Sequence, residues 1–118
     1  MILIEKILVA IIAIEHIYIL IIEMFLWTTP KGIKSFGLKS KEFAEETRVL
    51  GANQGLYNGF LAAGLLFSIY LNDETWSLFF VGCVIVASLY GAYSTKSMRI
   101  FYIQGIPAIA ALVTLLLN

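Results

Sequence analysis

The sequence predicts an all-α integral membrane protein, a bundle of four transmembrane helices in up-down order with both termini on the extracytoplasmic side. Hydrophobic residues make up 60% of the 118-residue chain and charged residues 14%, whereas soluble domains typically carry about 25% charged residues. Four stretches are long and apolar enough to cross a bilayer. Most cations lie in two of the connections between these stretches, which sets the expected orientation.

The same composition excludes several classes of protein. Lys plus Arg and Asp plus Glu both number 8, so the chain lacks the basic surplus of a nucleic-acid-binding protein and we expect no nucleic-acid partner. The single cysteine, Cys83, excludes a disulfide framework and a zinc cluster. We therefore expect one membrane domain over residues 1–118, multi-pass in the inner membrane of a cell, with the lipid bilayer as its main partner.

Each apolar stretch is expected to be a helix, because backbone amides in hydrocarbon must be satisfied within their own segment. The first stretch differs from a secretory signal, since its apolar run carries Glu15, His16 and Glu23 and lacks a cleavage site. We therefore treat it as a permanent span. The expected spans are 7–27, 49–71, 76–93 and 100–117.

The connection over residues 28–48 is the longest and the most basic. Together with the short third connection it holds seven of the 8 Lys and Arg residues. The positive-inside rule therefore places both connections in the cytoplasm and both termini outside. Within residues 28–48, Gly32 and Gly37 are expected to keep the chain irregular, and Ser40 is a suitable N-cap for a short helix over 41–48.

Ionisable residues within the first span need an explanation, because a carboxylate at the bilayer centre costs roughly 2.5 to 3.5 kcal/mol. Glu15 lies about 18 Å before Trp27 along a helix, close to the midplane. His16 is its neighbour, and Glu23 lies nearer the cytoplasmic end. These three residues favour a functional site, although His16 alone also fits a core histidine.

Polar residues of the second span occupy one arc of that helix and complement the carboxyl groups. Side-chain amides donate to a carboxylate and accept from a protonated carboxyl. Gln104 adds an amide one turn from the cytoplasmic end of the fourth span. Taken singly, the amides are explained more simply as interhelical hydrogen bonds worth about 0.6 kcal/mol each. Together they predict a ligand or proton site of Glu15, His16, Glu23, Asn53, Gln54, Tyr57, Asn58 and Gln104.

Small residues recur at a spacing of four on two of the expected spans. Such tracks let helices approach closely, and packing within the bundle is their favoured use, with formation of a homodimer second. The track on the third span ends at Gly91. The track on the second span contains Gly51, Gly55, Gly59 and Ala63.

Motifs of soluble enzymes are missing, among them HExxH, a glycine-rich phosphate loop and a nucleophile elbow. Glu15 and His16 are adjacent on a helix and point about 100° apart, so they cannot hold one metal ion. We therefore expect no metal and no cofactor, identify no catalytic residue, and favour a protein that is not an enzyme.

The leading interpretation is a polar intramembrane site, open to the cytoplasm, for proton-linked transport or binding of a small molecule. Two alternatives stay open. The first is a membrane-embedded enzyme or binding protein for a lipid-like substrate, with His16 or Glu23 as acid or base. The second is a structural or accessory membrane subunit. The identity of the small molecule is not encoded in any motif.

A resemblance to a known family covers essentially the whole chain. It is carried by residues 26–30 (Leu-Trp-Thr-Thr-Pro), 53–59 (Asn-Gln-Gly-Leu-Tyr-Asn-Gly) and 104–108 (Gln-Gly-Ile-Pro-Ala), together with Glu15-His16. At these positions the chain resembles the bacterial membrane-protein family catalogued as domain of unknown function thirteen-oh-four. The resemblance implies a bacterial inner-membrane protein with four spans. The family has no assigned activity, so the resemblance implies no catalytic residue.

Overall fold

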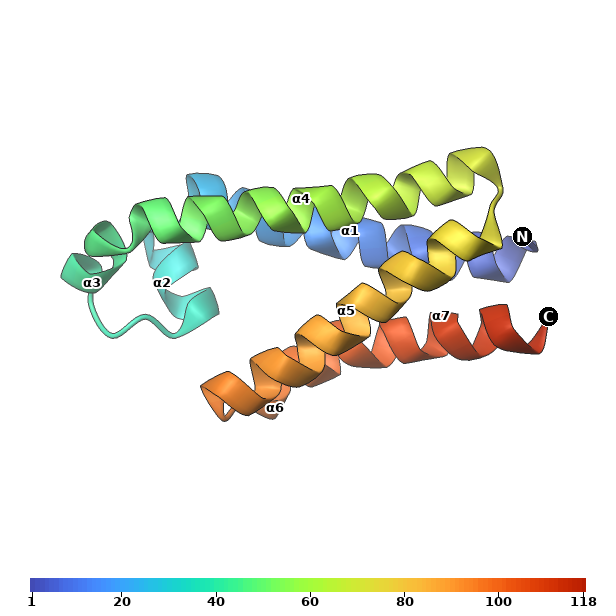
Figure 1. Cartoon of the computed structure of the whole chain (residues 1–118). Coiled ribbons are helices and arrows are strands. Elements are labelled where there is room, and N and C mark those ends of the chain that lie inside the picture. The colour runs from blue at the N-terminus through green and yellow to red at the C-terminus, as the bar shows by residue number, and fades with distance from the viewer. The chain divides into compact units, whose positions relative to one another are not determined.

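The computed structural model describes residues 1–118 and contains helices but no strand, which confirms the all-α class (Figure 1). Two short helices lie in the first connection, and a five-residue π-helical turn interrupts the last long helix. The elements are α1 (Leu3–Phe25), α2 (Pro30–Phe36), α3 (Lys41–Glu46), α4 (Arg48–Leu71), α5 (Glu74–Thr95), α6 (Met98–Ile100), η1 (Phe101–Gly105) and α7 (Ile106–Leu117).

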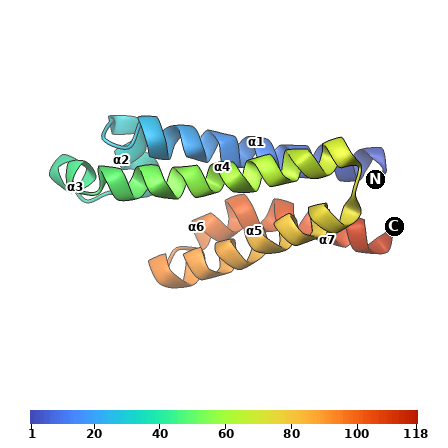
Figure 2. The same cartoon turned by 45° about the horizontal axis from the view of Figure 1, so that its top comes forward.

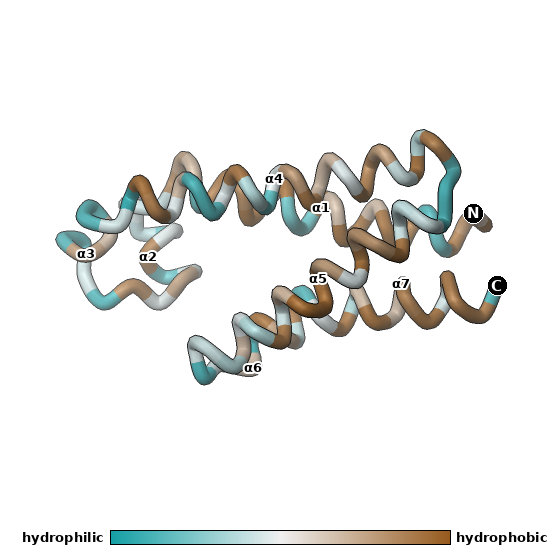
Figure 3. Tube along the Cα trace, in the orientation of Figure 1, coloured by the Kyte–Doolittle hydropathy of each residue, from teal (hydrophilic) through white to brown (hydrophobic).

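Three helices are long and apolar enough to cross a membrane: Leu3–Phe25, Glu74–Thr95 and Met98–Leu117. Helix α4 has 24 residues but is not among them, because the side-chain amides in its first half lower its hydropathy. Figure 3 shows hydrophobic residues along α1, α5 and α7, and hydrophilic residues in the α2–α3 connection. The composition therefore indicates a membrane-associated chain.

The chain divides into two compact units. Unit 1 consists of Met1–Glu15 and Leu61–Asn118, and unit 2 consists of His16–Phe60. Helices α1 and α4 each contribute one part to unit 1 and the other part to unit 2.

Unit 1 is built around a core of apolar side chains from its four long segments, with α5 and α7 packed along each other (Figure 2). Two buried serines of this core are hydrogen-bonded. Ser77 Oγ donates to Ser68 Oγ at 2.7 Å, and Ser68 Oγ donates to the Leu65 carbonyl at 2.6 Å. The core consists of Val9, Ile12, Ala13, Leu65, Val81, Val84, Ala108, Ala111 and Leu115.

The π-helical turn η1 comes directly before Pro107. Proline has no N–H, and in a regular α-helix its ring would collide with the carbonyl four residues earlier, that of Ile103. The wider turn moves the Ile103 carbonyl away from the proline ring. In this turn the Ile106 N–H donates to the carbonyl of Phe101, five residues earlier, rather than to the carbonyl four residues earlier. Gly105 is buried at this point, and a Cβ there would lie 2.7 Å from Ser88 Oγ.

Unit 2 contains the two short helices, and the expectation that Gly32 and Gly37 keep this stretch irregular is wrong. Helix α2 begins at Pro30, a residue that suits the first turn of a helix because its missing N–H needs no partner there. Thr29 caps the turn by accepting from the Gly32 N–H at 3.3 Å. Gly37, with φ of 61°, ends α2 in the left-handed conformation that favours glycine.

Helix α3 follows after a short linker. The Ser40 side chain accepts from the Phe43 N–H at 3.0 Å, which confirms Ser40 as its N-cap. Helix α3 ends at Glu46, and α4 begins after Thr47. The basic connection over residues 28–48 therefore contains two short capped helices, α2 and α3, between α1 and α4.

Candidate functional site

The candidate site is a buried carboxyl group in unit 2. Glu23 lies in the last turns of α1 and its side chain is fully buried. Gln54 Nε2 donates to its Oε2, and Asn58 Nδ2 donates to its Oε1. Each carboxyl oxygen of Glu23 therefore accepts from a different amide of α4.

Helix periodicity explains why two amides reach the same carboxyl group. Gln54 and Asn58 are four residues apart on α4, so they share one face of that helix. Gly55 lies between them in sequence, and a Cβ on Gly55 would lie 2.7 Å from Met24 Cγ and 3.0 Å from Glu23 Cβ. The absence of a side chain at Gly55 lets α1 and α4 come close enough for short amide side chains to span the gap.

Two further glycines of α4 border α1 in the same way. A Cβ on Gly51 would lie 2.6 Å from the Trp27 ring, and a Cβ on Gly59 would lie 2.6 Å from Leu20 Cδ1. Gly51 therefore faces Trp27, just after α1, and Gly55 and Gly59 face side chains of α1 itself within unit 2.

The last two residues of the expected packing set have different surroundings. Ala63 is exposed, and its neighbour Gly64 faces the ring of Phe80. Gly91 lies on α5, where a Cβ would approach Ile100 Cγ2 at 3.2 Å. Both positions belong to unit 1.

Trp27 closes the end of the site. Its Nε1 donates to Thr47 Oγ1 at 3.0 Å, and its ring packs against Phe36 with the centroids 5.1 Å apart. The ring also lies against Gly51. Sequence reasoning missed the Trp27–Thr47 hydrogen bond, because the small track that contains Gly51 predicted only a close approach of helices.

His16 is buried in unit 2, with 1% of its surface exposed. It lies two helical turns before Glu23, about 10 Å along α1 and on the same face of that helix. A buried imidazole donates and accepts hydrogen bonds. His16 therefore belongs to the same polar face of α1 as the carboxyl group.

Other residues of the expected site lie outside this cluster. Asn53 is exposed and its Nδ2 donates to the Val49 carbonyl of its own helix at 2.8 Å. Tyr57 is 66% exposed and contacts only the edge of Phe60 among aromatic rings. Glu15 and Gln104 belong to unit 1, where Glu15 Oε1 is buried without a hydrogen-bond partner and Gln104 lies in η1.

A second buried carboxyl group was missed by sequence reasoning. Glu5 in unit 1 is fully buried, its Oε2 accepts from the Ile2 N–H at 2.9 Å, and its Oε1 has no partner. A glutamate at the third position of a helix that bonds back to the preceding backbone N–H is typical of a capping box. Glu5 therefore caps α1, and the signal was its place in the first turn.

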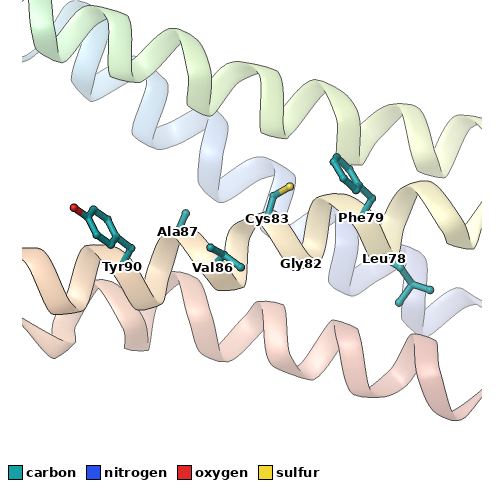
Figure 4. A pocket seen from close by; sticks show the side chains of 7 residues that line it. All are labelled: Leu78, Phe79, Gly82, Cys83, Val86, Ala87 and Tyr90. Carbon is teal, nitrogen blue, oxygen red and sulfur yellow. The ribbon is translucent and has the colours of Figure 1, made fainter.

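No group of three or more His, Cys, Asp or Glu side chains is placed to hold a metal ion. An open hollow of about 750 Å³ lies along one face of α5 (Figure 4). Its lining is almost wholly apolar, so it offers few hydrogen-bonding groups to orient a polar ligand. The lining residues are Leu78, Phe79, Gly82, Cys83, Val86, Ala87 and Tyr90.

Comparisons with known proteins give a family but no activity. The sequence profile of a family described as "Protein of unknown function (DUF1304)" matches residues 10–116. The "Uncharacterized protein YpaA" of Lactococcus lactis subsp. lactis (strain IL1403) is 31% identical over 107 residues, which cover 87% of this chain and 88% of that protein. No solved structure matches the chain.

Proposed function

Because this chain belongs to the family of proteins of unknown function DUF1304, we propose its function from the site itself: Glu23 exchanges a proton and links that exchange to binding and transport of a small molecule. The chain is then a multi-pass protein of the cytoplasmic membrane, with the site open to the cytoplasm. The observation that carries the proposal is a fully buried carboxyl group held by two amides of a neighbouring helix.

The proposal includes α4 as a fourth span. Its 24 residues give a length of about 36 Å, enough to cross the hydrocarbon core. Gln54 and Asn58 donate to Glu23, so the NH₂ groups of two residues that lower the hydropathy of α4 have partners within the protein. Polar groups satisfied in this way are tolerated within membrane-spanning helices.

A purely structural role explains Glu23 less well. Apolar side chains would pack between α1 and α4 without the cost of removing a carboxyl group from water. Interhelical hydrogen bonds return only about 0.6 kcal/mol each on average. An ionisable group kept at such a position therefore supports a role for its proton.

The orientation of the amides indicates the chemistry of the ligand. Gln54 and Asn58 use their NH₂ groups on Glu23, which leaves their carbonyl oxygens as acceptors. Gln54 is exposed and Asn58 is half-buried, so these oxygens are within reach of a small molecule. A carboxyl group and two carbonyl acceptors suit a ligand that brings hydrogen-bond donors, such as a protonated amine or a guanidinium ion.

Methylguanidinium is a suitable probe of this site. We expect its addition to protein in weakly buffered detergent solution to release protons, because the cation and the proton compete for Glu23. The Glu23→Gln variant keeps the shape of the side chain but cannot titrate, so it should release none. Glu74→Gln removes an exposed carboxyl group and serves as the matched control.

The two outcomes separate the proposal from a structural role. Proton release by wild type and Glu74→Gln, and its loss in a folded Glu23→Gln variant, supports proton-linked binding. Equal proton release from all three proteins, or none from wild type, rejects it. Folding of each variant is checked by circular dichroism and gel filtration.

A further inference from the structure

The first part of the connection between α1 and α4 is basic, ahead of the three glutamates of α3, Glu42, Glu45 and Glu46. We call residues 28–41 the basic segment: it contains Lys31, Lys34, Lys39 and Lys41 and no acidic residue. All four lysines are exposed. The ammonium groups of Lys31 and Lys39 lie over aromatic rings of the chain rather than against a carboxylate. The charge of this segment is therefore available to an external anion.

Helix α2 holds the first of these lysines in a defined place. Gly32 packs so closely on the end of α1 that a Cβ there would lie 2.7 Å from the Trp27 carbonyl oxygen. Phe36, on the same helix, packs against the Trp27 ring at 5.1 Å between centroids. Thr29 Oγ1 donates to the Leu26 carbonyl at 2.6 Å. The backbone that carries Lys31 is thus held at three points against Leu26 and Trp27, the residues that follow α1.

The side chain of Lys31 turns back along α1. Its Nζ lies 5.5 Å from the centroid of the Tyr18 ring, and Tyr18 precedes the end of α1 at Phe25 by about 10 Å of helix. Tyr18, Ile21 and Phe25 share one face of α1 at helical spacing and are 50%, 43% and 70% exposed. The ammonium group therefore lies beside an exposed apolar stripe.

We propose that the basic segment and this stripe together bind an anionic phospholipid. Lys31 and Lys34 are three residues apart on α2 and so present their charges on one face, where they would take the phosphate of the headgroup. The acyl chains would lie on Tyr18, Ile21 and Phe25. A free phosphate would leave the stripe uncovered, whereas a phospholipid satisfies both the charge and the apolar surface.

Lipid retention by the purified protein tests this assignment. The protein in neutral detergent is mixed with dioleoyl phosphatidylglycerol or with dioleoyl phosphatidylcholine, which have the same acyl chains, and bound lipid is counted by native mass spectrometry. We expect phosphatidylglycerol to be retained in preference. The double variant Lys31→Gln/Lys34→Gln should lose that preference about ten-fold or more, because each lysine near the headgroup contributes to the attraction.

Matched variants make the outcome decisive. Lys96→Gln/Arg99→Gln removes two exposed cations from unit 1 and should leave lipid retention unchanged, while Lys31→Arg/Lys34→Arg should restore it. Equal retention by the Gln and Arg variants of α2 overturns the proposal. Displacement of the lipid by millimolar inorganic phosphate also overturns it, since the site would then select the anion alone. These results do not depend on Glu23, so this inference and the proposed function fail separately.

Discussion

The effect of a glycine in this protein depends on what its missing side chain would meet. Gly51 faces the ring of Trp27, and that ring is itself held by Thr47 and Phe36, so it has little room to move. Gly82, on α5, has no atom within 4 Å of the position that its Cβ would occupy. The two residues are chemically identical and lie inside long helices, yet only the first is needed for packing.

A pair of alanine substitutions measures this difference. Gly51→Ala should destabilise the protein by about 1 to 3 kcal/mol, because the added methyl group overpacks the contact with Trp27. Gly82→Ala should be neutral or stabilising by about 0.5 to 1 kcal/mol, because alanine favours a helix more than glycine does. Unfolding in mixed micelles of dodecylmaltoside and SDS, followed by circular dichroism, gives both values. A loss of stability of equal size in both variants would show that Trp27 does not set the cost.

The contact between Glu23 and the amides shows which residues of a site the sequence can predict. Gln54 and Asn58 were expected in one polar cluster with Glu23 because the amides of the second span complement the carboxyl groups of the first, and the structure brings these three together. Asn53 and Tyr57 were expected with them because all lie in one arc of α4. The sequence shows that these residues share one side of α4, but it does not show which of them face α1. Asn53 points about 100° away from Gln54 around the helix axis.

Helix α2 is the element that sequence reasoning missed. Proline and glycine were treated as helix breakers, which is correct within a helix and wrong at its ends. Pro30 begins α2 and Gly37 ends it. A segment as short as this is not stable by propensity alone, and its packing of Phe36 on Trp27 supplies the missing stabilisation. That contact depends on the tertiary structure and leaves no periodic pattern in seven residues.

The end of α2 gives a test that is free of packing effects. Gly37 has φ of 61° and nothing lies within 4 Å of the position of a Cβ. Gly37→Ala should therefore destabilise α2 by about 1 to 2 kcal/mol through backbone strain alone. Gly37→Asn should cost less, because asparagine tolerates this conformation. Hydrogen exchange of the α2 amides should become faster in the alanine variant and change least in the asparagine variant, and the reverse order would contradict the capping role.

The turn η1 is predicted only in part by the sequence. Pro107 indicates that one carbonyl of the preceding turn lacks its helical partner, but it does not indicate how the chain responds. A kink and a five-residue turn are both common responses. The close fit of Gly105 against Ser88 accompanies the wider turn, and that fit is a tertiary feature.

At the scale of the whole chain, hydropathy alone resolves α1, α5 and the last long helix but not α4. A hydropathy sum takes no account of the hydrogen bonds that the NH₂ groups of Gln54 and Asn58 donate to Glu23. The all-helical class follows directly from composition, because it does not depend on which side chains of different helices form hydrogen bonds with each other. The four-span arrangement was predicted from four apolar stretches, but hydropathy selects only three of the long helices, so the fourth span stays a proposal that labelling can test.

The expected orientation in the membrane rests on the distribution of cations and is open to direct measurement. The 28–48 connection is expected in the cytoplasm and Asn118 outside, because seven of the 8 Lys and Arg residues lie in the first and third connections. Single cysteines are introduced as Ser35→Cys or Asn118→Cys in a Cys83→Ser background. A membrane-impermeant maleimide applied to intact cells should label only the variant at position 118. Labelling at position 35 instead would show that the orientation is the reverse of the expected one.

The division of the chain into two units has a consequence for biosynthesis. Unit 2 is one continuous stretch, whereas unit 1 joins two separated stretches. The hydrogen bond from Gln54 to Glu23 closes a separation of 31 positions, and that from Ser77 to Met1 closes 76. The longer closure costs about 0.8 kcal/mol more in chain entropy.

Ribosomes add roughly 5 to 20 residues per second, so residues 16–60 are complete several seconds before the last helix leaves the ribosome. Once residues 16–60 have left the ribosome, Glu23 can meet Gln54 and Asn58 before α7 is complete. The pairing of this buried carboxyl group therefore does not wait for α7.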